Sequence, residues 1–303
     1  MLSKNKNVKK KFPKIAVLLA AYNGEKYISE QIDSILKQKD VLIDIYISDD
    51  ASTDNTKQII KSFVDKNSNI IFLNDKRIGG PAKNFYNLIK QVDSGKYDFF
   101  ALSDQDDTWP EYRLSRATET LEKKSASAYS SDVIAVSEDS QFKKIIKKSQ
   151  PQKKYDHIFE TPGPGCSFVF NKTFFKFLQG NLDSQAFSFP YHDWLIYALA
   201  RQNQFNWIID DAPNLFYRQH NSNFMGANYG FFSRLKRLNR ILFGEYYKDL
   251  IQIYKITHNN KKHLNFLNVW FFIINFRQTR RKFRHALLMI PFLMIVSIQK
   301  NDI

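Results

Sequence analysis

The 303 residues include 45 Lys and Arg against 30 Asp and Glu, and 43% of the residues are hydrophobic. This composition provides a sizeable core and allows one large domain with an appendage, or two modest domains. The single cysteine, Cys166, excludes an intramolecular disulfide and a cysteine-based zinc site, which fits a reducing compartment. Residues 1–14 lack the apolar run that a signal peptide needs.

The formal net charge of +15 is concentrated at the two ends of the chain. Residues 1–14 contain six lysines and no acid, and residues 231–303 contain 14 Lys or Arg against three acids. The part between them therefore has a charge of about −2, as an ordinary soluble domain does. Both ends are suited to contact with something anionic.

From residue 15 onward, predicted strands alternate with predicted helices. The strands are expected at 15–21, 41–48, 70–73 and 97–103, and the helices at 25–38, 56–64 and 81–92. This succession predicts an α/β fold with a mostly parallel, Rossmann-like central sheet and flanking helices. Three of the strands end in polar clusters, at Tyr22-Asn23, Asp49-Asp50 and Asp104 to Asp107. Ligands bind at the carboxyl ends of strands in such sheets.

The pattern is weaker after residue 113. We expect strands at 133–136, 166–170 and 207–209, and a helix after His192-Asp193. A Pro-Gly loop at 161–165 precedes the second of these strands, and residues 214–220 lead into a polar loop.

Residues 231–303 are predicted to form basic, amphipathic helices. The apolar runs 266–276 and 286–298 are shorter than the roughly 20 residues that span a bilayer. Helices of this kind suit the membrane interface, although they could equally pack on the main domain or against a second subunit. Modules that read nucleic acids are absent, so we expect no nucleic-acid partner. The predicted organisation is a basic tail at 1–14, an α/β domain at 15–230 and a helical membrane-association or oligomerisation region at 231–303.

The segment 97–109 is an apolar run that ends in Asp104, Asp106 and Asp107. Crowded carboxylates repel one another and raise each other's pKa, and a divalent cation removes this repulsion. The segment therefore predicts a Mg²⁺ or Mn²⁺ site and a phosphate ester as substrate. A plain acidic turn after a strand is the alternative.

Four motifs, in this order, resemble those of the family-2 inverting glycosyltransferases of the GT-A fold. They are Ala20 to Gly24, Asp49 to Asp54, Asp104 to Asp107 and His192 to Trp194. The Asp-Gln-Asp-Asp-x-Trp form, with Tyr217 to Asn221 downstream, is most similar to the bacterial rhamnosyltransferase branch. The resemblance covers about residues 14–228.

The resemblance implies that Asp49 and Asp50 hold the nucleoside of a nucleotide-sugar donor. It also places Ala21, Tyr22, Asn23 and Asp104 around the nucleotide. A carboxylate can accept from a pyrimidine N–H, and the Tyr22 ring can cover the base. The alternative for Asp49 to Asp54 is a helix-capping turn.

The resemblance further implies a Mn²⁺ or Mg²⁺ ion held by Asp104, Asp106 and His220, which offsets charge as the nucleoside diphosphate leaves. Weaker expectations place four residues near the diphosphate or the acceptor. These are Asp107, Gly165, Trp194 and Arg218.

Asp193 matches the family's catalytic base, which takes the proton from an acceptor hydroxyl. A helix N-terminus favours its ionised form, and a capping Asp without chemical role is the alternative. The chain departs from the family at Ala51, where Gly is more frequent. It also lacks the Gln-x-x-Arg-Trp motif and long membrane spans of processive synthases, which favours single additions.

We therefore expect a cytoplasmic enzyme, peripheral at the inner face of the plasma membrane, which transfers rhamnose from dTDP-rhamnose or a hexose from a UDP donor. Its acceptor is expected to be a glycan or lipid-linked glycan of capsule or cell-surface polysaccharide. One alternative is a haloacid-dehalogenase-like phosphatase that uses Asp104 as nucleophile, since residues 104–108 fit its Asp-x-Asp-x-Thr signature. The other is a non-catalytic, membrane-associated protein that binds nucleotide sugars.

Overall fold

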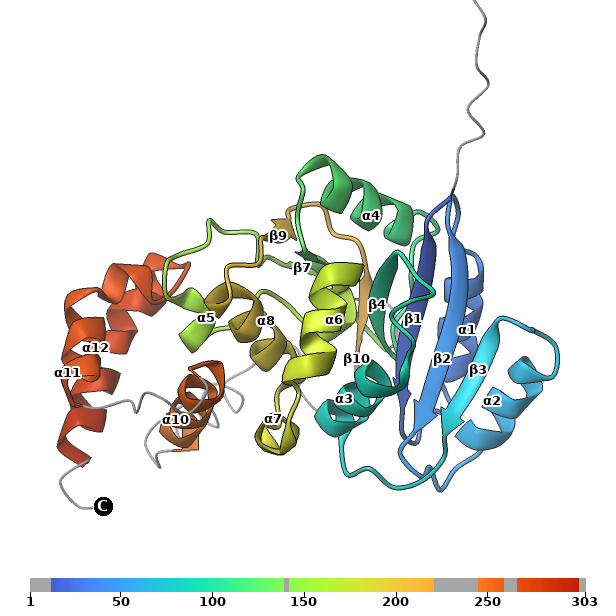
Figure 1. Ribbon diagram of the computed structural model, residues 1–303, viewed down its shortest axis with the longest axis horizontal. Helices are drawn as coiled ribbons and strands as arrows, with labels where there is room; N and C mark the ends of the chain where they lie inside the picture. Colours follow the sequence, from blue (N-terminus) through green and yellow to red (C-terminus); the bar gives the residue numbers. More distant parts are fainter. Residues whose placement is uncertain (1–11, 139–141, 221–244, 259–265, 300–303) are drawn as a thin grey trace, which may run out of the picture.

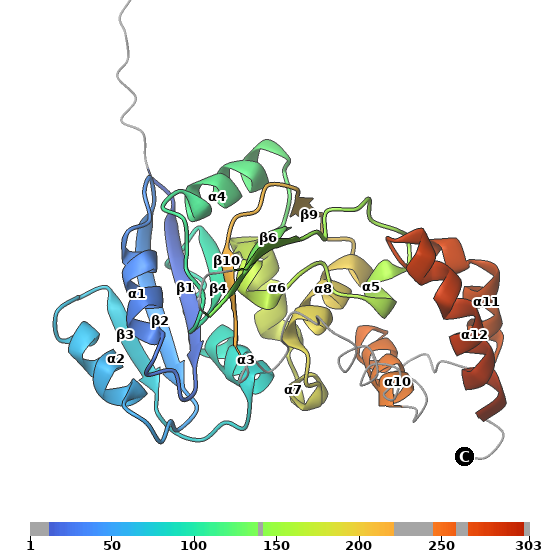
Figure 2. The same ribbon diagram turned by 180° about the vertical axis from the view of Figure 1, so that it is seen from behind.

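The computed structural model describes residues 12–138, 142–220, 245–258 and 266–299. A seven-stranded sheet in the order β3-β2-β1-β4-β8-β5-β9 forms its centre, and a second sheet has the order β10-β6-β7 (Figures 1 and 2). Only β8 runs antiparallel to its neighbours in the larger sheet. The predicted mostly parallel α/β fold is confirmed.

The strands are β1 (Lys14–Ala21), β2 (Leu42–Asp49), β3 (Ile70–Asn74), β4 (Phe99–Asp104), β5 (Ala128–Ser131), β6 (Val133–Ser137), β7 (Lys143–Ile146), β8 (Val169–Asn171), β9 (Trp207–Asp210) and β10 (Phe216–Gln219). The helices of the first 202 residues are α1 (Ile28–Leu36), α2 (Thr56–Val64), α3 (Pro81–Gln91), α4 (Arg113–Lys123), α5 (Asp156–Phe159), α6 (Lys172–Asn181), α7 (Ser184–Ser188) and α8 (His192–Gln202). Helices α10 (Glu245–Thr257), α11 (Phe266–Ile274) and α12 (Phe283–Gln299) follow, and η1 (Gly165–Ser167) and η2 (Phe276–Gln278) are short 3₁₀ turns.

Both faces of the central sheet are covered, which explains the continuous apolar run of β1. Ala16 and Leu18 face one core cluster, which α3, α6 and α8 cover, while Val17 and Leu19 face a second cluster under α1, α2 and α4. Side chains alternate between the two faces of a strand, so a strand buried on both sides needs apolar residues throughout.

The prediction for residues 166–170 was wrong in its first half. Residues 165–167 form the 3₁₀ turn η1, and the strand begins only at Val169. The Ser167 N–H donates to the Pro164 carbonyl at 3.0 Å, which closes a tight turn where a strand was expected. Sequence reasoning also missed the helices α4 and α6 and the strands β5 and β7, which have four residues each.

The C-terminal helices pack on the α/β domain. Val269, Phe272 and Leu293 belong to the same core cluster as α3 and α8, and both views show α11 beside α12 at one end of the molecule (Figures 1 and 2). Arg281, between η2 and α12, is fully buried and pairs with Asp156 at the start of α5 (3.4 Å). The two predicted apolar runs are therefore helices that share a core with the main domain.

The tail at 1–11 and the predicted helix around residues 231–242 lie outside the described residues. Within the described part, no helix combines the length and hydropathy needed to cross a bilayer.

Candidate active site

The polar ends of three neighbouring strands meet at one edge of the central sheet. Ala21 at the end of β1 is in register with Asp49 of β2, and Ala20 is in register with Asp104 of β4. The parallel pairing thus brings the three polar clusters of the sequence together, as predicted for the carboxyl edge of such a sheet.

Gln105 fixes the loop that follows β1. Its side-chain oxygen accepts from the Tyr22 N–H at 2.8 Å, and its amide nitrogen donates to the Tyr22 carbonyl at 2.8 Å. Gly24 leaves the space for this side chain, because a Cβ at that position would overlap the Gln105 amide. The Tyr22 ring remains 44% exposed, and the Arg77 guanidinium lies 5.7 Å from its centre. A planar ligand could stack on this ring.

Asn23 and Asp49 hold the loop after β2. The Asn23 side-chain oxygen accepts from the Thr53 N–H at 2.9 Å. Asp49 is buried and accepts from the Ser52 N–H at 3.1 Å and from the Ser52 hydroxyl. Burial raises the pKa of Asp49 above its usual value, although the Ser52 hydrogen bonds act in the opposite direction.

Asp50 anchors the loop that precedes α3. Its carboxylate accepts from the backbone N–H groups of Ile78, Gly79 (2.9 Å) and Gly80 (2.7 Å). Burial favours the protonated form, but these three donors outweigh it and keep the pKa of Asp50 below its usual value. Asp50 therefore carries a stable negative charge that shapes the loop containing Arg77.

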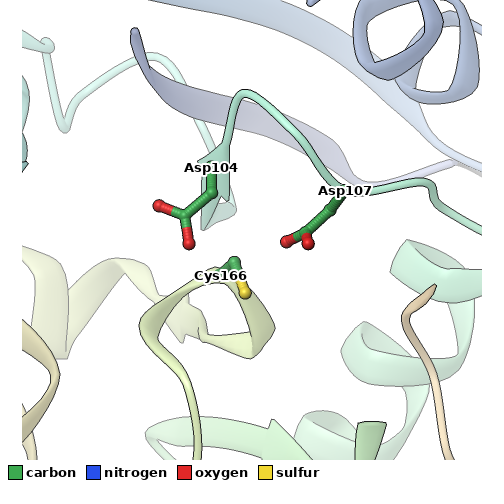
Figure 3. A group of neighbouring side chains, drawn as sticks. All are labelled: Asp104, Asp107 and Cys166. Carbon is green, nitrogen blue, oxygen red and sulfur yellow. The ribbon is translucent and has the colours of Figure 1, made fainter. Parts of the chain in front are cut away.

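Asp104 and Asp107 point toward the same space beside Cys166, as Figure 3 shows. One carboxylate oxygen of each acid and the Cys166 Sγ all lie within 4.8 Å of one another. The Asp107 side chain is fully buried; its Oδ1 accepts from the Arg218 N–H at 3.3 Å, while its Oδ2 has no hydrogen-bond partner. An unpaired buried carboxylate oxygen is costly unless a proton or a cation compensates it.

Burial and mutual repulsion raise the pKa of these acids. The pKa of Asp104 rises to about 7, first through burial and then through the charges of Asp106 and Asp193. The pKa of Asp107 is also raised, through burial and then through Asp106 and Asp104. Asp193, although almost 90 residues further along the chain, thus lies within electrostatic reach of Asp104.

Asp106 pairs with His220 at the end of β10. The His220 Nε2 lies 2.7 Å from the Asp106 Oδ2, and the imidazole stacks on the Tyr27 ring with 4.8 Å between centroids. The Tyr27 hydroxyl donates to Glu138 at 2.9 Å. The structure thus brings together Asp106 and His220, two of the three residues predicted as metal ligands. The third, Asp104, lies beside Asp107 and Cys166.

Arg218 is engaged by protein groups. Its Nε donates to the Asp106 carbonyl at 2.9 Å, and its Nη2 pairs with Glu30 of α1 at 2.6 Å. The sequence suggested Arg218 as a phosphate ligand, but in the structure it joins β10 to α1 and to the turn after β4.

Asp193 lies in the first turn of α8 and is not its N-cap residue, which is Tyr191. Its Oδ1 accepts from the N–H of the next residue, Trp194, at 2.8 Å. His192 lies against Gly165, where any Cβ would overlap the His192 Nε2. Gly165 thus allows the η1 turn to approach the start of α8.

Trp194 is 7% exposed and belongs to the core. Its indole N–H donates to the His157 carbonyl at 3.0 Å, and its ring stacks on Tyr246 with 5.8 Å between centroids. Trp194 therefore positions the start of α8 against α5 and α10.

These residues fit a divalent cation. Carboxylates are the preferred ligands of Mg²⁺ and Mn²⁺, and Asp104, Asp106 and Asp107 come from a single turn. The unpartnered Oδ2 of Asp107 and the raised pKa of Asp104 both indicate a site that lacks compensating positive charge.

Sequence reasoning did not predict that Cys166 lies beside the acids. It also did not predict that Arg113 is buried next to Cys166. The Arg113 guanidinium lies over the Trp109 ring, 3.6 Å from its centre, and donates to the Cys166 carbonyl. The Pro-Gly loop before Cys166 was the one feature of the sequence that could have indicated the position of Cys166. Nothing in the local sequence around Arg113 indicates that it is buried.

Comparison with known proteins gives one family and one fold. Residues 16–181 match the profile of glycosyl transferase family 2. The chain is 42% identical over 241 residues to the dTDP-rhamnosyl transferase RfbG of Shigella flexneri. The alignment covers 78% of this chain and 83% of that protein. It is 28% identical over 179 residues to the UDP-Glc:alpha-D-GlcNAc-diphosphoundecaprenol beta-1,3-glucosyltransferase WfgD of Escherichia coli, over 58% and 64% of the two chains.

Two solved structures share the fold. The TarS fragment 1–349 of S. aureus, in complex with UDP-GlcNAc, aligns with a TM-score of 0.54 at 19% identity over 80% of this chain and 72% of that one. The mannosyltransferase PcManGT of Pyrobaculum calidifontis, in complex with GDP-Man and Mn²⁺, aligns with a TM-score of 0.54 at 16% identity over 84% and 66%. The match to glycosyl transferase family 2 argues against the phosphatase alternative. A phosphatase would have no role for the motifs at Ala20 to Gly24 and Asp49 to Asp54. The chain belongs to glycosyl transferase family 2 and is a glycosyltransferase of the GT-A fold.

Proposed function

We propose that the protein transfers a sugar, with inversion, from a nucleoside diphosphate donor to a hydroxyl of a cell-surface glycan precursor. The observation that carries this proposal is the η1 turn, where Cys166 lies beside Asp104 and Asp107 while the adjacent Gly165 lies against His192, the neighbour of Asp193. A base and a metal-diphosphate site must lie this close for a hydroxyl to attack the anomeric carbon. The 42% identity to a dTDP-rhamnosyl transferase favours dTDP-rhamnose over UDP-hexoses.

The nucleoside would lie at the ends of β1 and β2. Tyr22 and Arg77 offer a ring and a guanidinium that can flank a base, and Asp49 and Asp50 offer carboxylates beside them. The Asp50 carboxylate also orders the loop that carries Arg77.

The diphosphate would lie at the acidic turn. Asp104, Asp106 and His220 would hold Mn²⁺ or Mg²⁺ there, and Asp107 would add a further negative charge beside the cation. Bound there, the cation would neutralise charge on the departing diphosphate. Tyr27 and Arg218 hold His220 and the turn in place.

Asp193 would be the general base. The helix dipole at the N-terminus of α8 favours a negative charge at this position, which suits a base that receives the acceptor proton. The acceptor proton then passes to Asp193 while the bond from the anomeric carbon to the diphosphate oxygen breaks. Gly165 and His192 set the position of the base.

The experiment that tests this proposal is a calorimetric titration with dTDP, UDP, GDP and their sugars, with and without Mn²⁺. Binding of one nucleotide that requires Mn²⁺ supports the transferase site and names the donor. If no nucleotide binds in the presence of Mn²⁺, the proposal is overturned.

We further propose that the enzyme is cytoplasmic and docks on the inner face of the plasma membrane. Residues of α11, α12 and their connection form an exposed surface, here called the basic–apolar face, which combines large apolar side chains with Arg and Lys. Its members are Trp270, Ile274, Arg277, Lys282, Phe283, Arg284, Leu287 and Leu288. Exposed apolar side chains beside cations suit an anionic lipid surface.

Deleting residues 231–303 would also remove part of the core, so point variants test membrane docking better. Ile274→Glu with Leu288→Glu should abolish flotation with phosphatidylglycerol vesicles, because both side chains are more than two-thirds exposed. Leu42→Glu, which alters an exposed leucine at the start of β2, is the matched control. If the double variant floats like wild type, the face does not bind lipid; a dimer in solution would assign it to a second copy of this chain.

A further inference from the structure

Two cations that the proposed mechanism does not use, Lys148 and Arg280, are connected through their neighbours to the segments that carry the base. Lys148 follows β7, and its Cγ lies 4.0 Å from the position that a Cβ on Gly163 would take. Gly163 and Gly165 belong to the same loop, and Gly165 contacts His192, the neighbour of Asp193. Lys148 thus reaches the acceptor side of the site from a part of the chain that sequence analysis left unassigned.

The backbone at Lys148 is firmly held. The buried Asp132 accepts from the Lys148 N–H at 2.6 Å, from the Ser149 N–H at 2.9 Å and from the Ser149 hydroxyl at 2.9 Å. The point from which the Lys148 side chain emerges is therefore fixed.

Arg280 reaches the same region from the C-terminal helices. Its Nη2 donates to the Tyr246 hydroxyl at 2.7 Å, and Tyr246 stacks on Trp194, the residue after Asp193. The Arg280 Nε is buried and has no hydrogen-bond partner. The adjacent Arg281 differs, because it is paired with Asp156 and Glu160 and donates to the Thr161 carbonyl at 2.6 Å.

Lys148 and Arg280 have no carboxylate in direct contact within the described part of the chain. Among the described residues, neither side chain forms an ion pair with a carboxylate. Burial lowers the pKa of Lys148 to about 8; the charges of Arg281 and Arg280 lower it as well, while Glu160 and Asp193 raise it. Of the two acids within reach, Glu160 is already paired with Arg281, so a negatively charged ligand would compensate the remaining cationic charge.

We propose that Lys148 and Arg280 bind a phosphate or diphosphate group of the acceptor. This inference rests on the proposed function, with Asp193 as the base. Because the cations lie within electrostatic reach of the base, the acceptor is a sugar whose anomeric phosphate is close to the attacked hydroxyl, rather than a long neutral glycan. Arg280 is followed within three residues by Phe283 of the basic–apolar face, so a lipid on the phosphate would extend toward that face.

A phosphate at this site has two possible sources, a lipid-linked glycosyl diphosphate or a water-soluble glycosyl phosphate. Citronellyl diphosphate and glucose 1-phosphate represent them, and citronellol and methyl glucoside are the uncharged partners. Each probe is titrated against the full chain in EDTA, without nucleotide and without vesicles.

The wild type should bind at least one charged probe and neither uncharged partner. Lys148→Met and Arg280→Gln should each weaken that binding about tenfold, since each removes a charge-assisted contact. Lys147→Met and Arg277→Gln, which remove exposed cations nearby, should bind like wild type. Binding of citronellyl diphosphate alone assigns the lipid-linked source, and equal binding of glucose 1-phosphate assigns the soluble source.

Variants of Lys148 and Arg280 that bind the probes as tightly as wild type overturn the inference. Displacement of the probe by the nucleoside diphosphate with Mn²⁺ also overturns it, because the cations would then belong to the donor site. A failure of the proposed function gives a different result. In that case the protein binds no nucleotide in the presence of Mn²⁺ but still binds the charged probe.

Discussion

His220 Nε2 lies 2.7 Å from Asp106 Oδ2, although 114 residues separate them in the chain. The contact connects β10 of the small sheet to the turn after β4 of the large sheet. It places an imidazole and a carboxylate, both usable as metal ligands, at the edge where three strand ends meet.

Asp106→Asn should therefore weaken metal-dependent nucleotide binding by at least about tenfold, because the variant keeps the shape of the side chain but loses its charge. Titration of Mn²⁺ in the presence of saturating nucleotide measures the effect, and EDTA should have a similar effect on the wild type. Asp33→Asn, at an exposed acid of α1, is the control. Unchanged Mn²⁺ affinity in Asp106→Asn would remove this residue from the metal site.

Asp193→Asn should reduce sugar transfer by about 10²- to 10⁴-fold and leave the nucleotide Kd unchanged, since only the proton acceptor is lost. Single-turnover rates and calorimetry measure the two effects separately. Asp211→Asn, at an exposed acid after β9, should behave like wild type. Loss of nucleotide binding in Asp193→Asn would instead indicate a structural role.

Gly165→Ala should impair transfer while nucleotide binding persists, because the new Cβ would overlap His192 next to the base. His192 cannot easily yield, since its ring packs on Phe85 with 4.3 Å between centroids. Gly180→Ala, where a Cβ meets nothing within 4 Å, is the matched control and should stabilise α6 by about 0.5–1 kcal/mol. Full transfer activity in Gly165→Ala would show that the His192 contact does not matter.

Arg281→Met should destabilise the protein by about 3–5 kcal/mol, because it leaves the buried Asp156 and the partly exposed Glu160 with one cation fewer. Urea denaturation at pH 7 measures the change in the free energy of unfolding. Arg284→Met, at an exposed position three residues later, should change it by no more than about 0.5 kcal/mol. Equal stability of the two variants would mean that the packing of the C-terminal helices does not depend on the ion pairs of Arg281.

Acidification should destabilise the protein through His157. Burial, followed by the charge of Arg201, lowers the pKa of His157 to about 4 from an ordinary value of 6.5. Between these values the unfolded chain binds a proton that the native state does not, so the free energy of unfolding falls as the pH falls from 6.5 to 4. The total loss is about 3 kcal/mol. His157→Gln should lose less stability than wild type between pH 7 and pH 4.5, and an identical loss would contradict the assignment.

The succession of strands and helices up to β4 could be predicted from sequence because each strand is a continuous apolar run that ends in polar residues. Helices α4 and α6 were missed although buried residues recur at helical spacing in α4, as Leu114, Ala117 and Leu121 do. The motifs also named most of the residues that the structure brings together at the candidate site, whose roles stay predictions. They missed Lys148, Arg280 and Cys166, whose surroundings come from segments far away in the chain.

The sequence by itself determined the family, the α/β class and the acids at the strand ends, because these depend on local patterns and on short motifs in a fixed order. Only the tertiary structure decided which side chains meet. It paired Asp106 with His220, engaged Arg218 with Glu30, and joined the C-terminal helices to the main core through Arg281. Contacts between distant segments depend on strand order and helix packing, which no single stretch of residues specifies.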